Sequence, residues 1–113
     1  MEIDEKFLRT LLDSLKDPFL FTDTDHVIRY MNKAAKSHYK QGETLLGTSL
    51  LDCHNPESCR MILGIFEDFK NNQYDEKLIT DNARYRIYMR AVRNENGELI
   101  GYYERYEPPI KQS

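Results

Sequence analysis

The sequence predicts an α+β fold, with a five-stranded antiparallel sheet covered on one face by helices and preceded by an amphipathic helix. Three observations lead to this prediction. Strand-like segments form a pair near the start and a group of three near the end, with helical spacing between them. Apolar residues before the first strand recur every three or four positions. A length of 113 residues suits one domain with one core.

The first predicted element is a helix over residues 3–16. Its apolar residues share one stripe, which we expect to pack on the outer face of the sheet or, as we favour, on a second copy. Pro18 ends the helix, because the residue before a proline is pushed out of the α region. We assign residues 1–17 to this dimerisation helix. Its predicted contact residues are Phe7, Leu8, Leu11, Leu12 and Leu15.

A hairpin is predicted over residues 18–31. The turn holds His26, a residue type that tolerates the positive φ often needed there. Asn32 then suits the N-cap of a short helix over 33–39, and single helical turns are expected at 43–47 and 48–52. Asn55 as N-cap and Pro56 in the first turn begin a longer helix that reaches about residue 71.

Three strands are predicted after this helix, over residues 77–80, 84–92 and 99–106. Residues 94–97 form the turn between the last two. The domain is therefore expected to span residues 18–107, and residues 108–113 form a tail.

Composition excludes several classes of protein. Sixteen basic and nineteen acidic residues give a net charge of −3, without the clustered basic excess of a nucleic-acid-binding domain. No apolar run approaches the roughly 20 residues that span a bilayer. The first six residues are too polar for a secretory signal, and two cysteines do not make a disulfide scaffold. We expect a cytoplasmic protein that binds neither nucleic acid nor membrane.

Several segments resemble the PAS family of sensor domains. The segment from Asp23 to Ala35 is similar to the opening signature of that family, Leu46 and Gly47 to its Leu-Gly pair, and residues 96–101 to its last hairpin. The resemblance covers residues 5–107. Residues 51–58 and 85–97 resemble more narrowly a subgroup found beside hemerythrin-like domains in anaerobic bacteria. The chain departs from the family after residue 107, where two prolines replace the usual Asp-Ile-Thr link to an output helix.

The resemblance implies a bacterial sensory module that binds a small ligand or cofactor between helices and sheet, forms a homodimer and signals to a partner protein. We do not expect an enzyme, because no Ser, Cys or Lys has a recognisable activating partner. The candidate pocket residues are Tyr30, Met31, Ile62, Phe66, Tyr85, Ile87 and Met89.

The alternative is a haem or redox sensor that uses Cys53, His54 and Cys59, since thiolate and imidazole ligate iron. Their spacing matches no standard zinc site, and no metal site is predicted. The structural interpretation, which we favour, makes Cys59 a small buried residue of the long helix. We do not expect flavin, because light-sensing PAS domains carry their cysteine at the position of Leu50, about nine residues earlier. The identity of any cofactor is left open.

Overall fold

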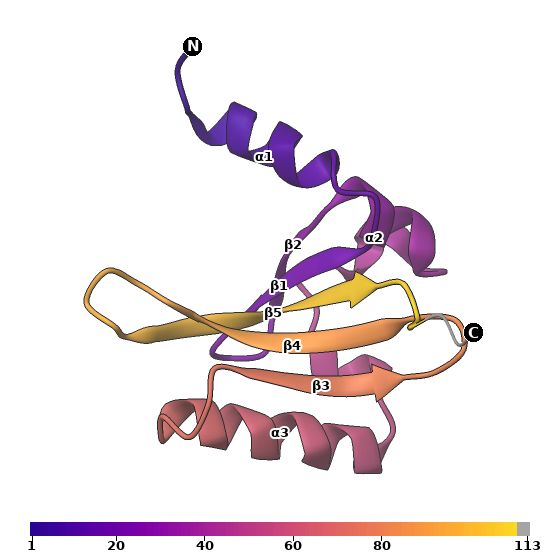
Figure 1. The fold of residues 1–113 in the computed structure, drawn as a ribbon, viewed down its shortest axis with the longest axis vertical. Coiled ribbons are helices and arrows are strands. Elements are labelled where there is room, and N and C mark those ends of the chain that lie inside the picture. Colours follow the sequence, from indigo (N-terminus) through magenta and orange to yellow (C-terminus); the bar gives the residue numbers. More distant parts are fainter. Residues whose placement is uncertain (111–113) are drawn as a thin grey trace.

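The computed structural model describes residues 1–110, so residues 111–113 of the predicted tail lie outside the described part. The order of elements confirms the predicted α+β fold (Figure 1). The elements are α1 (Glu5–Asp13), β1 (Phe19–Asp23), β2 (Ile28–Met31), α2 (Lys33–His38), the 3-10 helices η1 (Gly42–Leu45) and η2 (Leu50–Cys53), α3 (Pro56–Lys70), β3 (Glu76–Asp81), β4 (Arg86–Arg93) and β5 (Leu99–Glu107).

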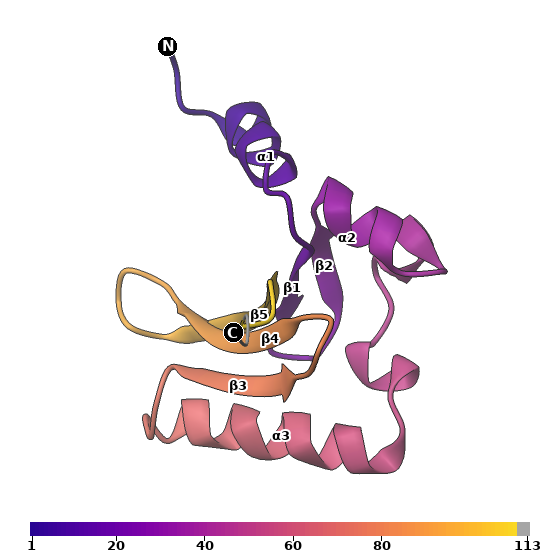
Figure 2. The same ribbon diagram turned by 45° about the vertical axis from the view of Figure 1, so that its right-hand side comes forward.

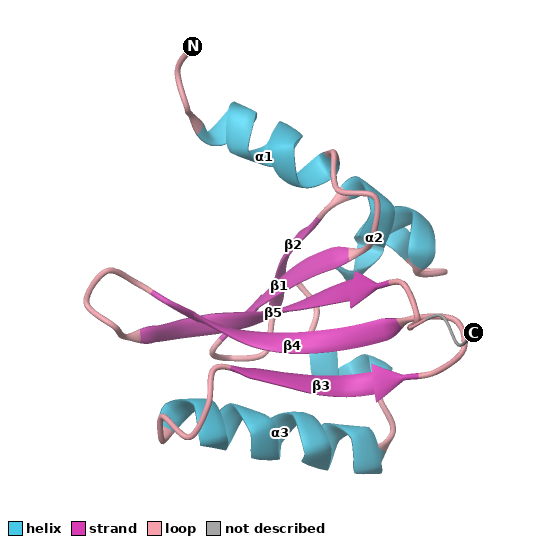
Figure 3. Ribbon diagram, in the orientation of Figure 1, coloured by secondary structure: helices cyan, strands magenta, loops and turns pink. Residues whose placement is uncertain are grey.

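The five strands form one antiparallel sheet in the order β2-β1-β5-β4-β3 (Figure 3). β5 therefore lies in the centre, paired with β1 and β4. Side chains of a strand alternate between the two faces, so every second residue of β5 points toward the helices. These inward positions are Tyr102, Glu104 and Tyr106, and all three are buried.

The core lies between the inner face of the sheet and the helices that follow β2. Its fully buried side chains include Leu20 of β1, Met89 of β4 and Phe69 of α3. α3 lies alongside β3 at one edge of the sheet, whereas α2 lies near β1 and β2 at the opposite edge (Figure 2). The space between α2 and α3 is spanned by η1 and η2, which bring polar side chains over the middle of the sheet.

α1 ends three residues earlier than predicted, at Asp13. The carbonyl of Leu12, which a longer helix would bond to residue 16, instead accepts a hydrogen bond from Nδ2 of Asn32 at 3.1 Å. The Asp13 carboxylate accepts from the backbone N–H of Lys33 and the hydroxyl of Tyr30, both at 3.0 Å. These bonds tie the end of α1 to the start of α2.

Asn32 holds this junction together. Its side chain is fully buried and accepts from the N–H groups of Phe19 and Ala35, which confirms its predicted role as N-cap of α2. Its Nδ2 donates to the carbonyls of Leu12 and Asp17. One side chain therefore joins α1, the linker, β1 and α2.

α1 otherwise projects away from the sheet and has no buried residue (Figure 1). The outer face of the sheet carries ion pairs on β3, β4 and β5 and the half-buried aromatic pair Phe19–Tyr103 on β1 and β5. Glu107 pairs with Arg86 at 3.3 Å and with Arg105 at 3.0 Å, and Glu76 pairs with Arg90 at 3.6 Å. Packing on that face, one of the two expectations for α1, is not what the structure shows. None of the helices within residues 1–110 has the length and apolar character to cross a membrane.

Side-chain contacts define the turn before β2 and the start of β4. His26 adopts the expected positive φ, 64°, and its Nδ1 lies 2.9 Å from the Tyr102 hydroxyl, so the turn residue also packs into the core. β4 begins at residue 86 instead of 84, because the Asn82 side chain accepts from the N–H groups of Arg84 and Tyr85 and keeps them in a turn.

Candidate ligand-binding site

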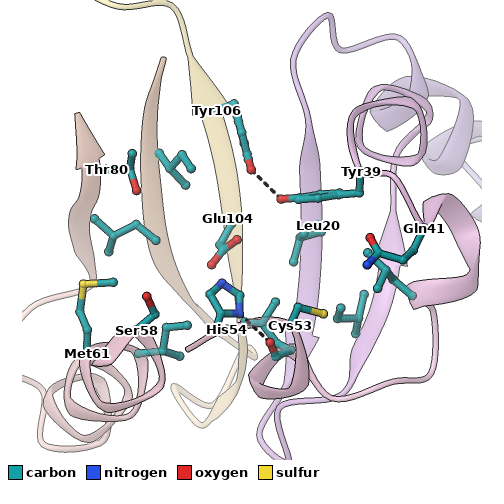
Figure 4. A pocket seen from close by; sticks show the side chains of 16 residues that line it. Leu20, Tyr39, Gln41, Cys53, His54, Ser58, Met61, Thr80, Glu104 and Tyr106 are labelled. Atoms are coloured by element: carbon teal, nitrogen blue, oxygen red, sulfur yellow. Dashed lines mark hydrogen bonds between the residues drawn. The ribbon is translucent and has the colours of Figure 1, made fainter. Parts of the chain in front are cut away.

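A cavity of about 300 Å³ lies between the inner face of the sheet and the helices (Figure 4). Leucine, isoleucine and methionine side chains form the apolar part of its wall. Its polar lining comes from α2, η1, η2, α3, β3 and β5 or the residues next to them. These polar residues are Tyr39, Gln41, Cys53, His54, Ser58, Thr80, Glu104 and Tyr106.

Glu104 is the only carboxylate that lines the cavity within the described part of the chain. It lies on the inner face of β5, opposite Leu20 of β1 and Met89 of β4, and is 5% exposed. No hydrogen bond or ion pair joins its side chain to any of residues 1–110. Burial raises the pKa of this carboxyl, and the nearby His54 opposes the shift.

His54 caps η2 and lines the cavity close to Glu104. Its Nδ1 lies 2.7 Å from the carbonyl oxygen of Leu50. A carbonyl can only accept, so Nδ1 carries a proton. The rest of the ring is directed toward Glu104 (Figure 4). Backbone geometry therefore fixes the orientation of this imidazole beside the buried carboxyl.

Two tyrosine hydroxyls close another side of the cavity. Tyr39 follows α2 as its C-cap, Tyr106 lies on β5, and their hydroxyl oxygens are 2.7 Å apart (Figure 4). Burial raises the pKa of Tyr106 to about 12 and raises that of Tyr39 further. Both phenols are therefore neutral near pH 7. Only one of them can donate to the other, so one O–H hydrogen is left for another acceptor.

A model of the PAS domain family matches residues 8–107, nearly the whole chain. The chain belongs to the PAS domain family. No curated protein matches it by sequence. The narrower resemblance to the subgroup beside hemerythrin-like domains stays a prediction.

Solved structures show the same PAS fold at low sequence identity. A C-terminal domain from Streptococcus mutans has a TM-score of 0.78 and 21% identity, covering 94% of this chain and 85% of that one. The PAS domain of a protein from Colwellia psychrerythraea has a TM-score of 0.67 and 17% identity, covering 95% and 98%. A sensory box sensor histidine kinase from Vibrio cholerae has a TM-score of 0.64 and 18% identity, covering 95% and 92%.

The structure of this PAS domain separates the predicted pocket residues into two groups. Ile62 of α3 and Ile87 of β4 line the cavity. Met31, Phe66 and Met89 are buried in the core but do not line the cavity. The apolar character of these three residues indicated that they are buried. Whether a buried residue also reaches the cavity depends on how the helices cross the sheet, which the sequence pattern does not show.

The other two predicted pocket residues lie outside the cavity. The Tyr30 hydroxyl donates to the carboxylate of Asp13 at the end of α1. The Tyr85 ring precedes β4 and packs against Tyr106, with 5.0 Å between the ring centroids. Tyr30 thus contributes to the junction with α1, and Tyr85 supports a tyrosine that does line the cavity.

The three candidate cofactor residues are not brought together as ligands. Cys53 and His54 line the cavity, whereas Sγ of Cys59 donates to the carbonyl of Leu51 at 3.2 Å. Burial raises the pKa of Cys53, which favours the thiol over the metal-binding thiolate. Within residues 1–110, no group of three His, Cys, Asp or Glu side chains is arranged to hold a metal ion.

The cavity does not fit haem. Haem carries two propionates, yet the described lining contains no Lys or Arg to pair with them. The buried Glu104 carboxyl stands beside His54, where an axial histidine would need apolar surface for the porphyrin ring. A volume of about 300 Å³ is also at the lower end of the usual range for ligand pockets.

Sequence reasoning missed the residues that give the cavity its chemistry, which are Tyr39, Gln41, Glu104 and Tyr106. Tyr39 and Gln41 follow a short helix and carry no periodic signal. Glu104 lies on a predicted strand in which tyrosines and charged residues occur on both faces, so the sequence around it did not indicate which face is buried.

Proposed function

We propose that this PAS domain is a sensory module that binds a small ligand in the cavity and transmits its occupancy to a dimer formed through α1. The observation that carries the proposal is the buried, unpaired carboxyl of Glu104 at the wall of the cavity. A buried polar group without a hydrogen-bond partner costs about 1–3 kcal/mol, and more when it is charged. A ligand that donates to Glu104 would remove this cost.

The lining supports a small polar metabolite. Hydrogen-bonding groups lie among apolar side chains, the usual composition of a specific ligand pocket. We further propose that the module acts in the cytoplasm without catalytic turnover. Within residues 1–110, neither Cys53 nor Ser58 is hydrogen-bonded to the His54 ring, and the pKa of Cys53 is raised, so no activated nucleophile lines the cavity.

α2 provides the route from the cavity to α1. Tyr39 at its C-terminal end contacts the cavity, and Asn32 at its N-terminal end binds the carbonyl of Leu12 in α1. A ligand that displaces the Tyr39 hydroxyl from Tyr106 would move one end of a six-residue helix whose other end holds α1. Such a ligand biases an equilibrium between two packings of α2 and α1.

A second copy of the chain is the proposed partner for α1. Leu8 and Leu11 lie three residues apart on one side of this helix and are 48% and 52% exposed, and Leu15, just after the helix, is 46% exposed. The face continues the stripe expected from the sequence, and the ion-paired outer face of the sheet does not cover it. The signal would then reach a partner protein through the geometry of the dimer.

The proposal is tested by measuring thermal stability of the purified protein with a library of small metabolites, and dimer dissociation with each hit. We expect a hit to raise the melting temperature and to change the dimer dissociation constant. Ser58→Leu, which fills the cavity, should abolish the response, whereas Gly64→Leu on the open side of α3 should keep it. Hits that stabilise both variants equally would place binding outside the cavity and contradict the proposal.

The haem alternative makes a different prediction, which an ultraviolet-visible spectrum with added haem under reducing conditions checks. We expect no haem band. A sharp band that disappears in His54→Ala would support a haem sensor and overturn the assignment of the cavity to a small metabolite.

A further inference from the structure

We propose that the ligand of this cavity is a small primary amine, bound as the ammonium cation against Glu104. This inference rests on the proposed function, because it names the chemical class of ligand that the same cavity takes. Its basis is the charge and the hydrogen-bonding capacity of the cavity wall.

The charges of the wall favour a cation. Glu104 is the only acidic residue and His54 the only basic residue among those that line the cavity in the described part of the chain. Among residues 1–110, no arginine or lysine lines the cavity to pair with Glu104. A ligand carboxylate or phosphate would meet a carboxyl group and no permanent cation. An ammonium group supplies an interaction that the described residues do not make with Glu104.

The groups around Glu104 do not supply that interaction themselves. The titratable groups that act on Glu104 or feel its charge are Cys53 and His54 from η2 and its cap, Tyr39 after α2, and Tyr102 and Tyr106 on β5. β3 and α3 contribute only uncharged side chains such as Thr80 and Ser58 to the wall, and β1 and β4 only apolar ones. None of these residues is within hydrogen-bond distance of the Glu104 carboxylate.

The polar atoms of the wall match the three donors of an ammonium group. Glu104 and Tyr106 are two residues apart on the same face of β5, so their oxygens lie on one wall (Figure 4). The paired hydroxyls of Tyr106 and Tyr39 offer acceptor lone pairs, and the Gln41 amide offers a carbonyl oxygen. The aromatic rings beside these hydroxyls also attract a cation. The apolar part of the wall is then left for the hydrocarbon part of the ligand.

Binding should depend on pH in one direction. Burial without a partner raises the pKa of Glu104, so the ligand-free protein keeps a proton at this carboxyl to a higher pH than an exposed glutamate does. An ammonium ion binds the carboxylate, so this proton must leave first. Below the pKa of the empty site, affinity should fall about tenfold for each pH unit. A ligand that binds as an anion would show the opposite dependence.

The experiment uses matched probes that differ only in the polar group. Ethyl, butyl and 2-phenylethyl chains, each as primary amine, alcohol and carboxylate, are titrated into the full chain by calorimetry and by thermal shift at pH 4.5 and pH 8. The variants are Glu104→Gln and, as a control with the same change of charge, Glu95→Gln in the exposed turn before β5.

We expect at least one amine to bind wild type more tightly than its alcohol and carboxylate, with higher affinity at pH 8. Glu104→Gln should weaken this amine by about tenfold or more, since a charge-assisted hydrogen bond is lost, and Glu95→Gln should leave it unchanged. Tighter binding of an alcohol or carboxylate, or equal amine affinity in Glu104→Gln, would overturn the amine assignment and leave ligand binding standing. No response to any chain in any of the three forms would overturn both the amine assignment and the cavity as a ligand site.

Discussion

Replacing Glu104 with glutamine should make the ligand-free protein more stable at alkaline pH. The carboxyl is 5% exposed and unpaired, and burial raises its pKa above the ordinary value of 4.5. The folded state therefore holds this proton more tightly than the unfolded state. Stability consequently falls as pH rises from about 4.5 to the raised pKa, by up to about 1.4 kcal/mol per pH unit, and is then constant. Glutamine has nearly the same shape and no proton to lose.

We expect Glu104→Gln and wild type to differ little at pH 4.5. At pH 8 the variant should be more stable by about 1.4 kcal/mol for each pH unit by which folding raises the pKa of Glu104, because glutamine leaves the same hydrogen bonds unmet but cannot ionise. Urea denaturation at both pH values measures the difference. His26, whose pKa burial lowers, is present in both proteins, so its contribution cancels in the comparison. Glu95→Gln should show no such change between the two pH values. A variant less stable than wild type at pH 8 would mean that the Glu104 carboxylate has a partner, and the reasoning would fail.

Three further substitutions test the junction, the dimer and α3. Leu11→Asp on the exposed apolar face of α1 should raise the dimer dissociation constant at least about tenfold in sedimentation, whereas Thr10→Asp should not. Asn32→Ala should lower the free energy of unfolding in urea by about 3 kcal/mol, because it removes four hydrogen bonds of a buried side chain. Gly64→Ala should raise it by up to about 1 kcal/mol, since the added methyl group meets no atom within 4 Å and alanine favours the helix.

Each of these three predictions would be contradicted by a specific result. Equal dissociation constants for Leu11→Asp and Thr10→Asp would remove α1 from the dimer interface. A loss below about 1 kcal/mol in Asn32→Ala would mean that water replaces the lost hydrogen bonds. A destabilising Gly64→Ala would show that α3 bends at this position in solution.

Local rules were sufficient for the elements whose ends depend on neighbouring residues. Asn32 and Asn55 cap the helices expected of them, and His26 has the expected positive φ. The end of α1 depends instead on a side chain twenty residues later, since Asn32 binds the carbonyl of Leu12. No rule confined to the sequence around residues 12–16 contains that contact.

The pocket residues show the same limit. Ile62, from its helical spacing, and Ile87, from strand alternation, were candidate pocket residues, and both lie at the cavity wall. Met31 and Met89 share that pattern but are buried elsewhere in the core. Periodicity assigns a side chain to a face of its element, while the position of a cavity depends on which helix passes over that face.

Glu104 shows why the chemistry of the cavity was harder to predict than its position. In β5, one face carries Tyr102, Glu104 and Tyr106, and the other carries Tyr103 and Arg105. Each face thus combines tyrosine with a charged residue, so hydrophobic patterning gives no reason to choose between them. The register with β1 and β4 decides the matter, since it places Glu104 opposite the buried Leu20 and Met89. A carboxylate in such a position opposes folding unless it is paired or protonated, and within residues 1–110 it has no hydrogen-bond partner, which is the interaction that the proposed ligand would supply.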